Sequence, residues 1–458
     1  MENQVHQNTE DRLNRLSDAI QSGSLLKLQG MINAMHPAEI AHLLESSPPS
    51  RRSFLWELID SSNEGETLIE LGEEVRASLV EDMGSGELVA AVKNLDVDDV
   101  ADFLQSLPAT LIDQTLAGMS RQQRERVEAV LAYDEDTAGG MMDTQVITTR
   151  ANVTVDVVLR YLRMQEQLPS HTDTLIIIDK YEKYIGILPI NDLLTSQPEQ
   201  NIQEIIDDQH PAIPADMPSS EVASLFEDRN LISAPVVDDN GKLLGRITID
   251  DVVDVIRDEA EHSMMGMAGL NEEEDLFAPI LSSVKRRALW LGTNLLTAFL
   301  AAWVIKQFSS TLESAIALVV LMSIVPSMGG IAGSQTLTLV IRGLALGQIG
   351  KSNTHSLIVK ELFLGLMNGL LWAIVVFAIS VLAFNDTGIG IIVAIAMLLN
   401  LLAAPLAGVI LPIILQKLGV DPALAGSVLL TTITDVVGYA AVLGLATLLL
   451  PYIRTMIA

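Results

Sequence analysis

The hydrophobic residues of this chain follow two different patterns. Up to residue 284, apolar positions recur at helical or alternating spacing among many charges, which is typical of globular domains. From Lys285 onward they form five nearly continuous apolar stretches, each long enough to cross about 30 Å of hydrocarbon. The stretches run over residues 288–306, 314–341, 355–383, 388–415 and 423–450. The pattern therefore predicts a multidomain membrane protein whose C-terminal domain, residues 285–458, is a bundle of five α-helical spans in lipid.

The N-terminal part predicts a set of short helices. Residues 36–44 and 98–104 both place apolar side chains at helical spacing behind a proline or an aspartate, which favour the first turn of a helix. Similar segments recur between residues 10 and 135. We expect an acidic helical N-terminal domain over residues 1–135, with its short helices stacked in a superhelix.

An internal repeat follows. Residues 184–193 match residues 243–252, and the glycines Gly186 and Gly245 are offset by 59 positions. Each copy is preceded by an apolar run that ends in an acid and is followed by a stretch suited to a helix. A strand–turn–strand–helix unit that occurs twice resembles a tandem pair of CBS domains, which are α/β modules, and we assign it to residues 136–260.

The resemblance to CBS domains implies one candidate nucleotide site. Where such domains bind a nucleotide, a threonine and an aspartate three residues later hold the ribose. Thr248 and Asp251 have this spacing in the second copy, whereas the first copy has Pro189 in place of the threonine. The sequence therefore leaves open whether an adenine nucleotide such as ATP binds at this site.

Charge is divided unevenly along the chain. Residues 1–284 contain 53 acidic and 19 basic side chains, and residues 285–458 contain 5 and 9. An acidic surface argues against nucleic-acid binding, because phosphates require a basic face, and it suits hard cations such as Mg²⁺ or only keeps the domain soluble. There is no cysteine, which excludes thiol chemistry and disulfides.

Basic residues indicate the sidedness of the membrane domain. Lys285–Arg287, Arg342 with Lys351, and Lys417 lie in regions that share one side if there are five spans. The positive-inside rule makes that side the cytoplasm and puts the C-terminus outside. The polar, acidic residues that follow Met1 lack the apolar core of a signal peptide, so we expect the N-terminal domains to be cytoplasmic.

Two features within the spans indicate a path for a cation. Asp435 is an acid near the middle of the last span, where a carboxylate is unfavourable unless it faces a partner, a cavity or an ion. The second span contains Pro326 and several glycines, which we expect to interrupt the helix and free carbonyl oxygens. Helix packing is the alternative explanation for both features. The other acids near the spans are expected at solvated ends: Glu313, Glu361, Asp386 and Asp421.

The order of domains and three motifs resemble the MgtE family of magnesium transporters. The motifs are residues 133–142, residues 329–335 followed by 342–345, and residues 431–438. The resemblance implies a homodimeric Mg²⁺ channel in the cell membrane, with a pore between the second and fifth spans and Asp435 as its metal-binding carboxylate. The residues expected to line this pore are Gly329, Gly330, Ile331, Gly333, Gln335, Thr431 and Thr432. Ile331 departs from the family, which often has asparagine at this position. We therefore expect the change to affect the selectivity of the pore among cations.

The resemblance also implies closure of the channel when cytoplasmic Mg²⁺ is high. The ion would bridge acidic residues between the domains, at the positions Glu66, Asp98, Asp102, Asp251 and Glu259. Asn230 and His262 stand where the family has two further acids, so we expect weaker feedback. A linking helix over residues 261–284 would move with the CBS pair and plug the cytoplasmic mouth.

Two other functions remain as alternatives. In a proton-coupled divalent-metal transporter, Asp435 would carry a proton and exchange it for a metal. In a membrane-anchored nucleotide sensor, Thr248 and Asp251 would be essential and Asp435 dispensable. No enzyme is expected, because the sequence contains no nucleophile–base pair and no phosphate-binding glycine loop.

Overall fold

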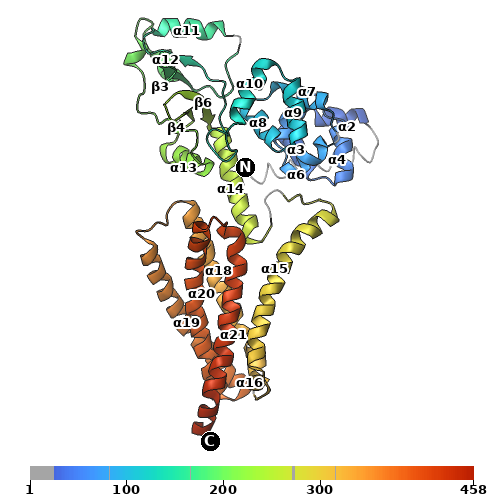
Figure 1. Cartoon of the computed structure of the whole chain (residues 1–458), viewed down its shortest axis with the longest axis vertical. Coiled ribbons are helices and arrows are strands. Elements are labelled where there is room, and N and C mark those ends of the chain that lie inside the picture. Colours follow the sequence, from blue (N-terminus) through green and yellow to red (C-terminus); the bar gives the residue numbers. More distant parts are fainter. Residues whose placement is uncertain (1–24, 82, 166, 271–273, 315, 458) are drawn as a thin grey trace. The chain divides into compact units, whose positions relative to one another are not determined.

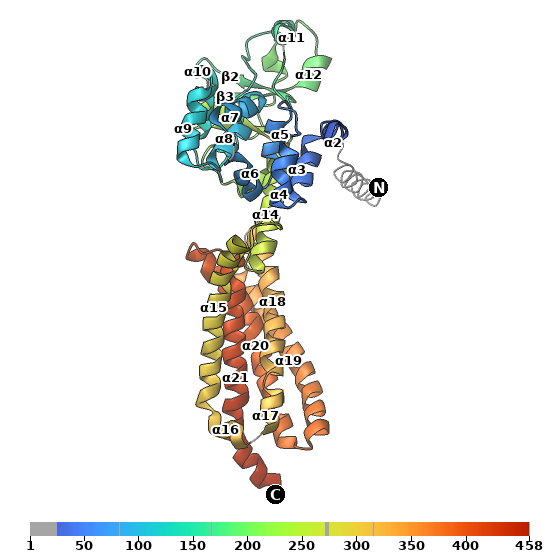
Figure 2. The ribbon, with the colours of Figure 1, turned by 90° about the vertical axis from the view of Figure 1, so that its right-hand side faces the viewer.

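The structure is a computed structural model, and it describes residues 25–81, 83–165, 167–270, 274–314 and 316–457. These residues form two compact units. The first runs to Glu259 and includes the segment that ends at Pro279; the second comprises the residues from Ala260 and those from Ile280 onward. Figures 1 and 2 show both units, each of which is described here by itself.

The first unit begins with a domain made only of short helices. Helix α3 shows why they form where they do: Pro37 occupies the first helical position, and Glu39 Oε2 accepts a hydrogen bond from the His36 backbone N–H at 3.2 Å, which completes a capping box. The prediction of a helical N-terminal domain is confirmed. Its helices are α2 (Leu25–Ile32), α3 (Pro37–Glu45), α4 (Pro49–Trp56), α5 (Glu64–Ile69), α6 (Glu73–Val80), α7 (Ser85–Ala91), η1 (Val92–Asn94), α8 (Val97–Gln105), α9 (Ala109–Gly118) and α10 (Arg121–Val130).

Two small mixed sheets follow, and they are built alike. In each sheet the first pair of strands is parallel and the second pair antiparallel. The pair Thr174↔Pro189 in the first sheet corresponds to Ser233↔Thr248 in the second, at the offset of the sequence repeat. The prediction of two CBS domains is confirmed. Their elements are β1 (Thr148–Thr149), α11 (Val155–Met164), β2 (Thr174–Ile178), β3 (Tyr184–Pro189), α12 (Ile190–Thr195) and η2 (Ile202–Glu204), then β4 (Ile213–Pro214), α13 (Ser219–Arg229), β5 (Ser233–Val237), β6 (Leu243–Thr248) and α14 (Ile249–Met267).

The second CBS domain shares a hydrophobic core with the helical domain. Phe103 of α8 and Phe226 of α13 are both about fully buried and belong to one continuous cluster of apolar side chains. The first CBS domain has a core of its own, which contains Val155 and Leu175. The shared core fixes α8 beside the start of α14, and this juxtaposition creates the acidic cluster described below.

A short segment before the membrane domain is bound to the helical domain. Arg52 of α4 donates two hydrogen bonds to the carboxylate of Asp275, at 2.6 and 2.8 Å, and both side chains are at most 4% exposed. The Asp275 backbone N–H donates to Glu74 Oε2 at 2.8 Å. The segment that ends at Pro279 is therefore part of the first unit although it follows α14 in the chain.

The second unit contains five helices long and apolar enough to cross a membrane, counted over the described residues. α20 is the central helix, because it packs against α18, α19 and α21, and more of it is buried than of any other span. The prediction of five apolar helices is confirmed. The helices are α15 (Ile280–Gln307), the short α16 (Ser309–Ser314) and α17 (Ile316–Leu321), then α18 (Ile324–Ala345), α19 (Thr354–Phe384), α20 (Thr387–Lys417) and α21 (Pro422–Ile457).

The glycine-rich segment does not interrupt its helix. The break in the second span lies between α17 and α18, at residues 322–323, and α18 is continuous through Gly329, Gly330 and Gly333. Pro326 is tolerated because it lies in the first turn of α18, where a missing N–H leaves no hydrogen bond unmade. The expectation of freed carbonyl oxygens at these glycines was wrong.

The linking helix also differs from the expected range of 261–284. α14 begins at Ile249, directly after the last CBS strand, and ends at Met267. Gly269 has a φ of 71°, a left-handed conformation that suits glycine and ends the helix, and α15 begins only at Ile280. Residues 271–273 of the expected range lie outside the described residues.

Candidate functional site

An open groove runs along the face of α18 that points away from the rest of the second unit. It is lined by Ser327, Gly330, Ile331, Ser334, Gln335, Thr338 and Leu339. These positions recur every three or four residues, so they form one stripe of the helix, and four of its seven residues carry a hydroxyl or an amide. A stripe of hydroxyl and amide groups on an otherwise apolar membrane helix needs a polar partner or water.

Asp435 lies on α21, half-buried, beside this helix. The preceding Thr434 is 1% exposed, and its Oγ1 lies 3.9 Å from the position that a Cβ on Gly330 would occupy. Gly438 packs against Pro326, since a Cβ there would lie 2.8 Å from Pro326 Cγ and 3.0 Å from its Cα. The small residues thus let α21 approach α18 closely next to the carboxylate.

The residues expected to line the pore divide into two groups. Gly330, Ile331 and Gln335 line the groove. Gly329 and Gly333 are buried on the opposite side of α18, where they admit the side chains of Asn400 and Leu430, so they serve helix packing.

The two threonines expected beside Asp435 form hydrogen bonds within their own helix. Thr431 is exposed and donates to the Ser427 carbonyl at 2.9 Å, and the half-buried Thr432 donates to the Val428 carbonyl at 2.8 Å. Their oxygens keep a lone pair as acceptors. Both hydroxyls can therefore still accept a hydrogen bond from the hydration shell of a cation.

Two buried polar side chains of the bundle were missed by the sequence reasoning. Asn400 of α20 is fully buried, and its Nδ2 donates to the Val325 carbonyl of α18 at 2.8 Å. Glu361 of α19 is 5% exposed and accepts a hydrogen bond from Thr336 Oγ1 at 2.9 Å. The expectation of a solvated Glu361 was wrong, because this residue lies two turns inside α19 against α18. A lone asparagine inside an apolar span was the signal for Asn400.

A cluster of carboxylates lies where α8 meets the start of α14 in the first unit. Asp98 is 7% exposed and its Oδ1 has no hydrogen-bond partner among the described residues. Burial and the charge of Asp251 raise the pKa of Asp98 well above its usual value. Burial together with the charge of Asp250 raises the pKa of Asp251 to about 8. These carboxylates repel one another, so a proton or a cation stabilises the contact.

The acidic cluster continues along α8 toward the C-terminal end of this helix. Burial and the charge of Asp96 raise the pKa of Asp99 to about 7. Desolvation by neighbouring atoms and the charge of Glu135 raise the pKa of Asp102 to about 7. The residue is nevertheless exposed to solvent, so we expect water to weaken this shift. Among the described residues, no three acidic or histidine side chains are arranged as a ready metal site.

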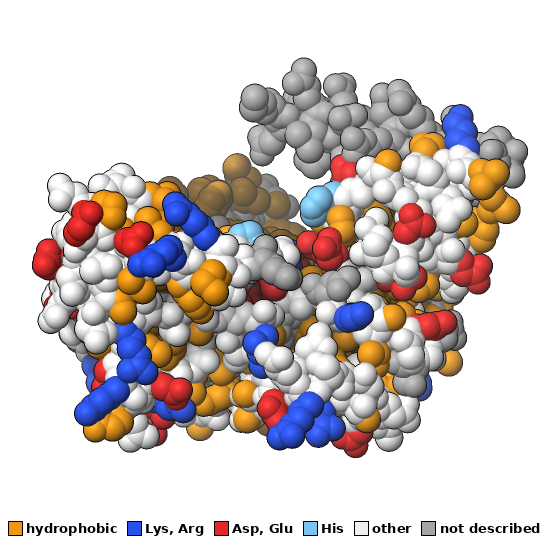
Figure 3. Space-filling model, turned by 90° about the horizontal axis from the view of Figure 1, so that it is seen from above, with side chains coloured by type: hydrophobic (Ala, Val, Ile, Leu, Met, Phe, Trp, Pro, Cys, Tyr) orange, Lys and Arg blue, Asp and Glu red, His pale blue; other side chains and the backbone are white. Residues whose placement is uncertain are grey.

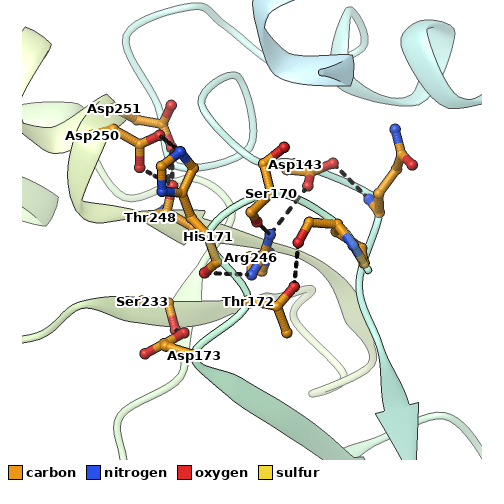
Figure 4. A network of polar contacts seen from close by, with 12 residues as sticks. Asp143, Ser170, His171, Thr172, Asp173, Ser233, Arg246, Thr248, Asp250 and Asp251 are labelled. Carbon is orange, nitrogen blue, oxygen red and sulfur yellow. Dashed lines mark hydrogen bonds and ion pairs between the residues drawn. The ribbon is translucent and has the colours of Figure 1, made fainter. Parts of the chain in front are cut away.

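The candidate ribose site shares a residue with this cluster. Asp251 Oδ2 accepts hydrogen bonds from the Thr248 backbone N–H at 3.1 Å and from Thr248 Oγ1 at 3.2 Å. Thr248 Oγ1 also contacts Asp250, whose carboxylate lies 3.5 Å from His171 Nε2 (Figure 4). Arg246 donates to the carbonyls of Ser170 and His171, so the loop that carries His171 is held beside Thr248. Thr248 and Asp251 are thus adjacent, as expected, but already bonded to each other.

Charges of both signs are mixed on the face of the molecule seen from above. Figure 3 shows acidic and basic side chains scattered over it among apolar ones. The acidic excess of the sequence therefore does not form one continuous acidic patch on this face.

Comparison with known proteins places these features in a family. A model of the MgtE family, described as a divalent cation transporter, matches residues 322–445, which include α18 and most of α21. A model of the MgtE intracellular N domain matches residues 35–136, and CBS domain models match residues 138–199 and 202–258. The chain belongs to the MgtE family.

Relatives span nearly the whole chain. The magnesium transporter MgtE of Thermus thermophilus is 29% identical over 442 residues, which are 95% of this chain and 98% of that protein. The magnesium transporter MgtE of Bacillus subtilis is 26% identical over 433 residues, 94% of this chain and 96% of that protein. A crystal structure of the cytosolic domain of the Mg²⁺ channel MgtE in complex with ATP is 29% identical and covers 53% of this chain and 99% of that one, with a TM-score of 0.49.

Membership in MgtE settles the class of this protein. It is a multi-pass membrane protein with an intracellular N-terminal domain, and it belongs to a family of transporters, as predicted, rather than to a family of enzymes.

The remaining acids expected to sense Mg²⁺ are outside the buried cluster. Glu66 of α5 and Glu259 of α14 are both exposed. Asn230 ends α13 in the left-handed conformation, with a φ of 51°, which asparagine tolerates better than most residues. His262 Nε2 lies 3.0 Å from Asp421 Oδ2, which also accepts from the Leu424 backbone N–H at the start of α21. In this chain a histidine–carboxylate pair thus joins α14 to α21.

Proposed function

We propose that this MgtE-family protein is a Mg²⁺-selective channel that mediates Mg²⁺ uptake across the cell membrane as a homodimer. The ion would pass between α18 and α21 of the two copies, with Asp435 as the metal-binding carboxylate of the pore. The observation that carries this proposal is the polar groove on the outward face of α18, next to Asp435, in a domain that is otherwise apolar.

Membrane energetics support a second copy at this groove. Ser334 donates to the Gly330 carbonyl and Thr338 donates to Met267 Sδ. Facing lipid, the Ser327 hydroxyl and the Gln335 amide would have no hydrogen-bond partner among the described residues, whereas a second groove and a column of water would supply them. Mg²⁺ gives up its water reluctantly and usually keeps several water molecules. One Asp435 from each copy, with Thr431 and Thr432 nearby, suits an ion that remains hydrated. The names of the full-length relatives, magnesium transporters, favour the same cargo.

Repulsion in the acidic cluster supports closure by cytoplasmic Mg²⁺. Without a cation, the raised pKa values of Asp98 and Asp251 mean that their charges oppose the packing of α8 against α14. A divalent ion at this contact would neutralise them and hold the cytoplasmic domains together. The exposed Asp102, Glu66 and Glu259 would contribute less, because solvent screens their charges.

The first test is Mg²⁺ influx into proteoliposomes for the intact protein and for Asp435→Asn. Asp386→Asn is the matched control, because Asp386 only accepts from the Ile389 backbone N–H at the start of α20. We expect the intact protein and the control to conduct and Asp435→Asn, still folded, to lose at least about tenfold in flux.

Each alternative predicts a different outcome in this assay. Flux that requires an opposing pH gradient indicates a proton-coupled transporter. Equal flux in the intact protein and in Asp435→Asn contradicts the proposed path. No flux from any variant at low internal Mg²⁺ favours the nucleotide sensor.

Two further properties belong to the proposal. Five spans after an intracellular N-terminal domain put the C-terminus outside the cell, which labelling of an added C-terminal tag in intact cells would test. Adenine-nucleotide binding at Thr248 and Asp251 is a secondary proposal that rests on their adjacency at the β6–α14 junction. Titration of the intact protein with ATP, compared with Thr248→Val, would test it.

A further inference from the structure

Among the described residues of the membrane domain, Asn400 is the most fully buried polar side chain that the proposed function does not use. It lies near the middle of α20, with 0% of its surface exposed. Its Nδ2 donates to the Val325 carbonyl at 2.8 Å, and its Oδ1 has no hydrogen-bond partner among the described residues. An amide that is buried at membrane depth with its oxygen unpaired costs free energy. Its position therefore calls for an explanation.

The glycine opposite Asn400 is shaped to receive it. A Cβ on Gly329 would overlap Asn400 Nδ2 and would lie 2.8 Å from its Cγ. Gly329 follows Val325 by one helical turn, so the missing side chain at Gly329 leaves room for the amide to reach the Val325 carbonyl. The pair Gly329 and Asn400 therefore fixes how closely α18 and α20 approach.

The turn of α18 that Asn400 holds also touches α21. Pro326 follows Val325 directly and packs against Gly438 of α21. Because residues 322–323 are not helical and proline lacks an N–H, this first turn has fewer backbone hydrogen bonds than an interior turn would have. The Asn400 side chain of α20 and the backbone of α21 at Gly438 contact this turn from two sides.

The same turn carries the first residues of the groove. Ser327 and Gly330 line it, and Gly330 is next to Thr434, the residue before Asp435. A rotation or shift of α18 at Val325 would change the distance between the groove and the carboxylate.

The geometry points to Asn400 as a positioning residue for the ion path: by holding the Val325 carbonyl it sets the spacing between the groove of α18 and Asp435, and thereby the selectivity for hydrated Mg²⁺. This inference rests on the proposed ion path. Asn400 touches no ion; it acts through α18.

The test compares Asn400→Leu, which has similar volume and no amide, with Ser380→Ala. Ser380 is the matched control, because it is 1% exposed in α19 and its Oγ has no hydrogen-bond partner among the described residues. We expect Asn400→Leu to change the ratio of Mg²⁺ to Co²⁺ and Ca²⁺ flux at least about threefold, because roughly 1 Å of looseness is enough to impair a preorganised site. Ser380→Ala should match the intact protein.

A role in folding alone predicts a different result. Asn400→Leu would then give less folded protein, or a lower melting temperature, with unchanged selectivity per folded channel, and this outcome would overturn the inference. Unchanged folding and unchanged flux would overturn it as well.

A second measurement does not depend on transport. The chain has no cysteine, so spin labels can be placed uniquely at cysteines introduced for Ile324 on α18 and Leu448 on α21, both exposed. In labelled protein diluted with unlabelled protein, we expect Asn400→Leu to shift or broaden the distance between them. A shifted distance without Mg²⁺ flux in the intact protein would refute the channel and show only that Asn400 sets the spacing of α18 and α21. An unshifted distance with Mg²⁺ flux would refute the positioning role and leave the channel standing.

Discussion

At Asp98, a buried carboxylate faces Asp251 across the contact between α8 and α14, and both have raised pKa values. An aspartate whose pKa is raised in the folded state binds more protons there than in the unfolded chain. The free energy of unfolding therefore falls as pH rises from about 4 toward the folded pKa values and levels off above them. For this cluster the window ends near the pKa of Asp251, about 8.

The variant Asp98→Asn makes this repulsion measurable. Without Mg²⁺, we expect Asp98→Asn to be more stable than the intact protein at pH 8.5, by about 1 kcal/mol or more, and nearly equal at pH 5, where the intact cluster is protonated. Mg²⁺ should stabilise the intact protein more than the variant. Thermal unfolding at both pH values, with and without Mg²⁺, checks this.

Asp113→Asn removes an exposed charge of the same helical domain and serves as the control. It should shift the unfolding temperature equally at pH 5 and pH 8.5. If Asp98→Asn behaves in the same way as Asp113→Asn, the charge at Asp98 does not oppose the packing of α8.

Among the helices, one of the close contacts between α18 and α21 requires a glycine, Gly438. A methyl group at Gly438 would meet Pro326 at 2.8 Å, whereas a Cβ at Gly444, six residues later in α21, would meet nothing within 4 Å. The two positions thus offer the same substitution in the same helix with opposite surroundings.

We expect Gly438→Ala to separate α21 from α18 and to lower Mg²⁺ flux, with a loss of stability of about 1–3 kcal/mol from overpacking. Gly444→Ala should be neutral or slightly stabilising, because alanine favours helices over glycine. Flux in proteoliposomes and melting temperature in detergent measure both effects. Equal behaviour of the two variants would contradict the close contact at Pro326.

For the helices and strands, the sequence predicted which elements exist but not the residues at which they begin and end. Five spans and two CBS repeats followed from apolar length and from the offset of Gly186 and Gly245, signals carried by many residues at once. The break at residues 322–323 and the end of α14 at Met267 each depend on a single turn of the chain. Pro326 lies in the first turn after the break, and the left-handed Gly269 follows the end of α14.

The candidate site was predictable only in part for a similar reason. Asp435 stood out because it is charged among apolar residues. Gly329 lies on the side of α18 that contacts α20, and Glu361 is buried on the side of α19 that contacts α18. Both facts depend on which neighbouring helix packs against each side. Such contacts join residues far apart in the chain, so periodicity within one segment does not reveal them.

For the whole molecule, the groove of α18 determines the expected assembly. A polar stripe that faces outward in one copy would be satisfied by the same stripe of a second copy related by twofold symmetry, as in the proposed homodimer. The dimer would bring the two grooves together and leave the outer surface of α19 in lipid.

Single cysteines introduced into this cysteine-free chain test the arrangement. We expect Ile331→Cys, in the groove, to form a disulfide between two copies in membranes under mild oxidation. Leu382→Cys, on α19 and 86% exposed, should not. Crosslinking at residue 382 without crosslinking at residue 331, read as dimer bands on a denaturing gel, would require a different interface.

The ion pair of Arg52 with Asp275 decides where the cytoplasmic part of this protein can be cut for study on its own. A fragment that stops at Met267, the end of α14, removes the carboxylate that pairs with the guanidinium of Arg52, and breaking a buried pair costs about 3–5 kcal/mol. A fragment that continues to Pro279 keeps the pair. The longer fragment should therefore unfold at the higher temperature, and Asp275→Asn should remove most of that difference. Soluble material prepared for ligand screening needs these last residues, although residues 274–279, which the structure describes, contain no helix or strand.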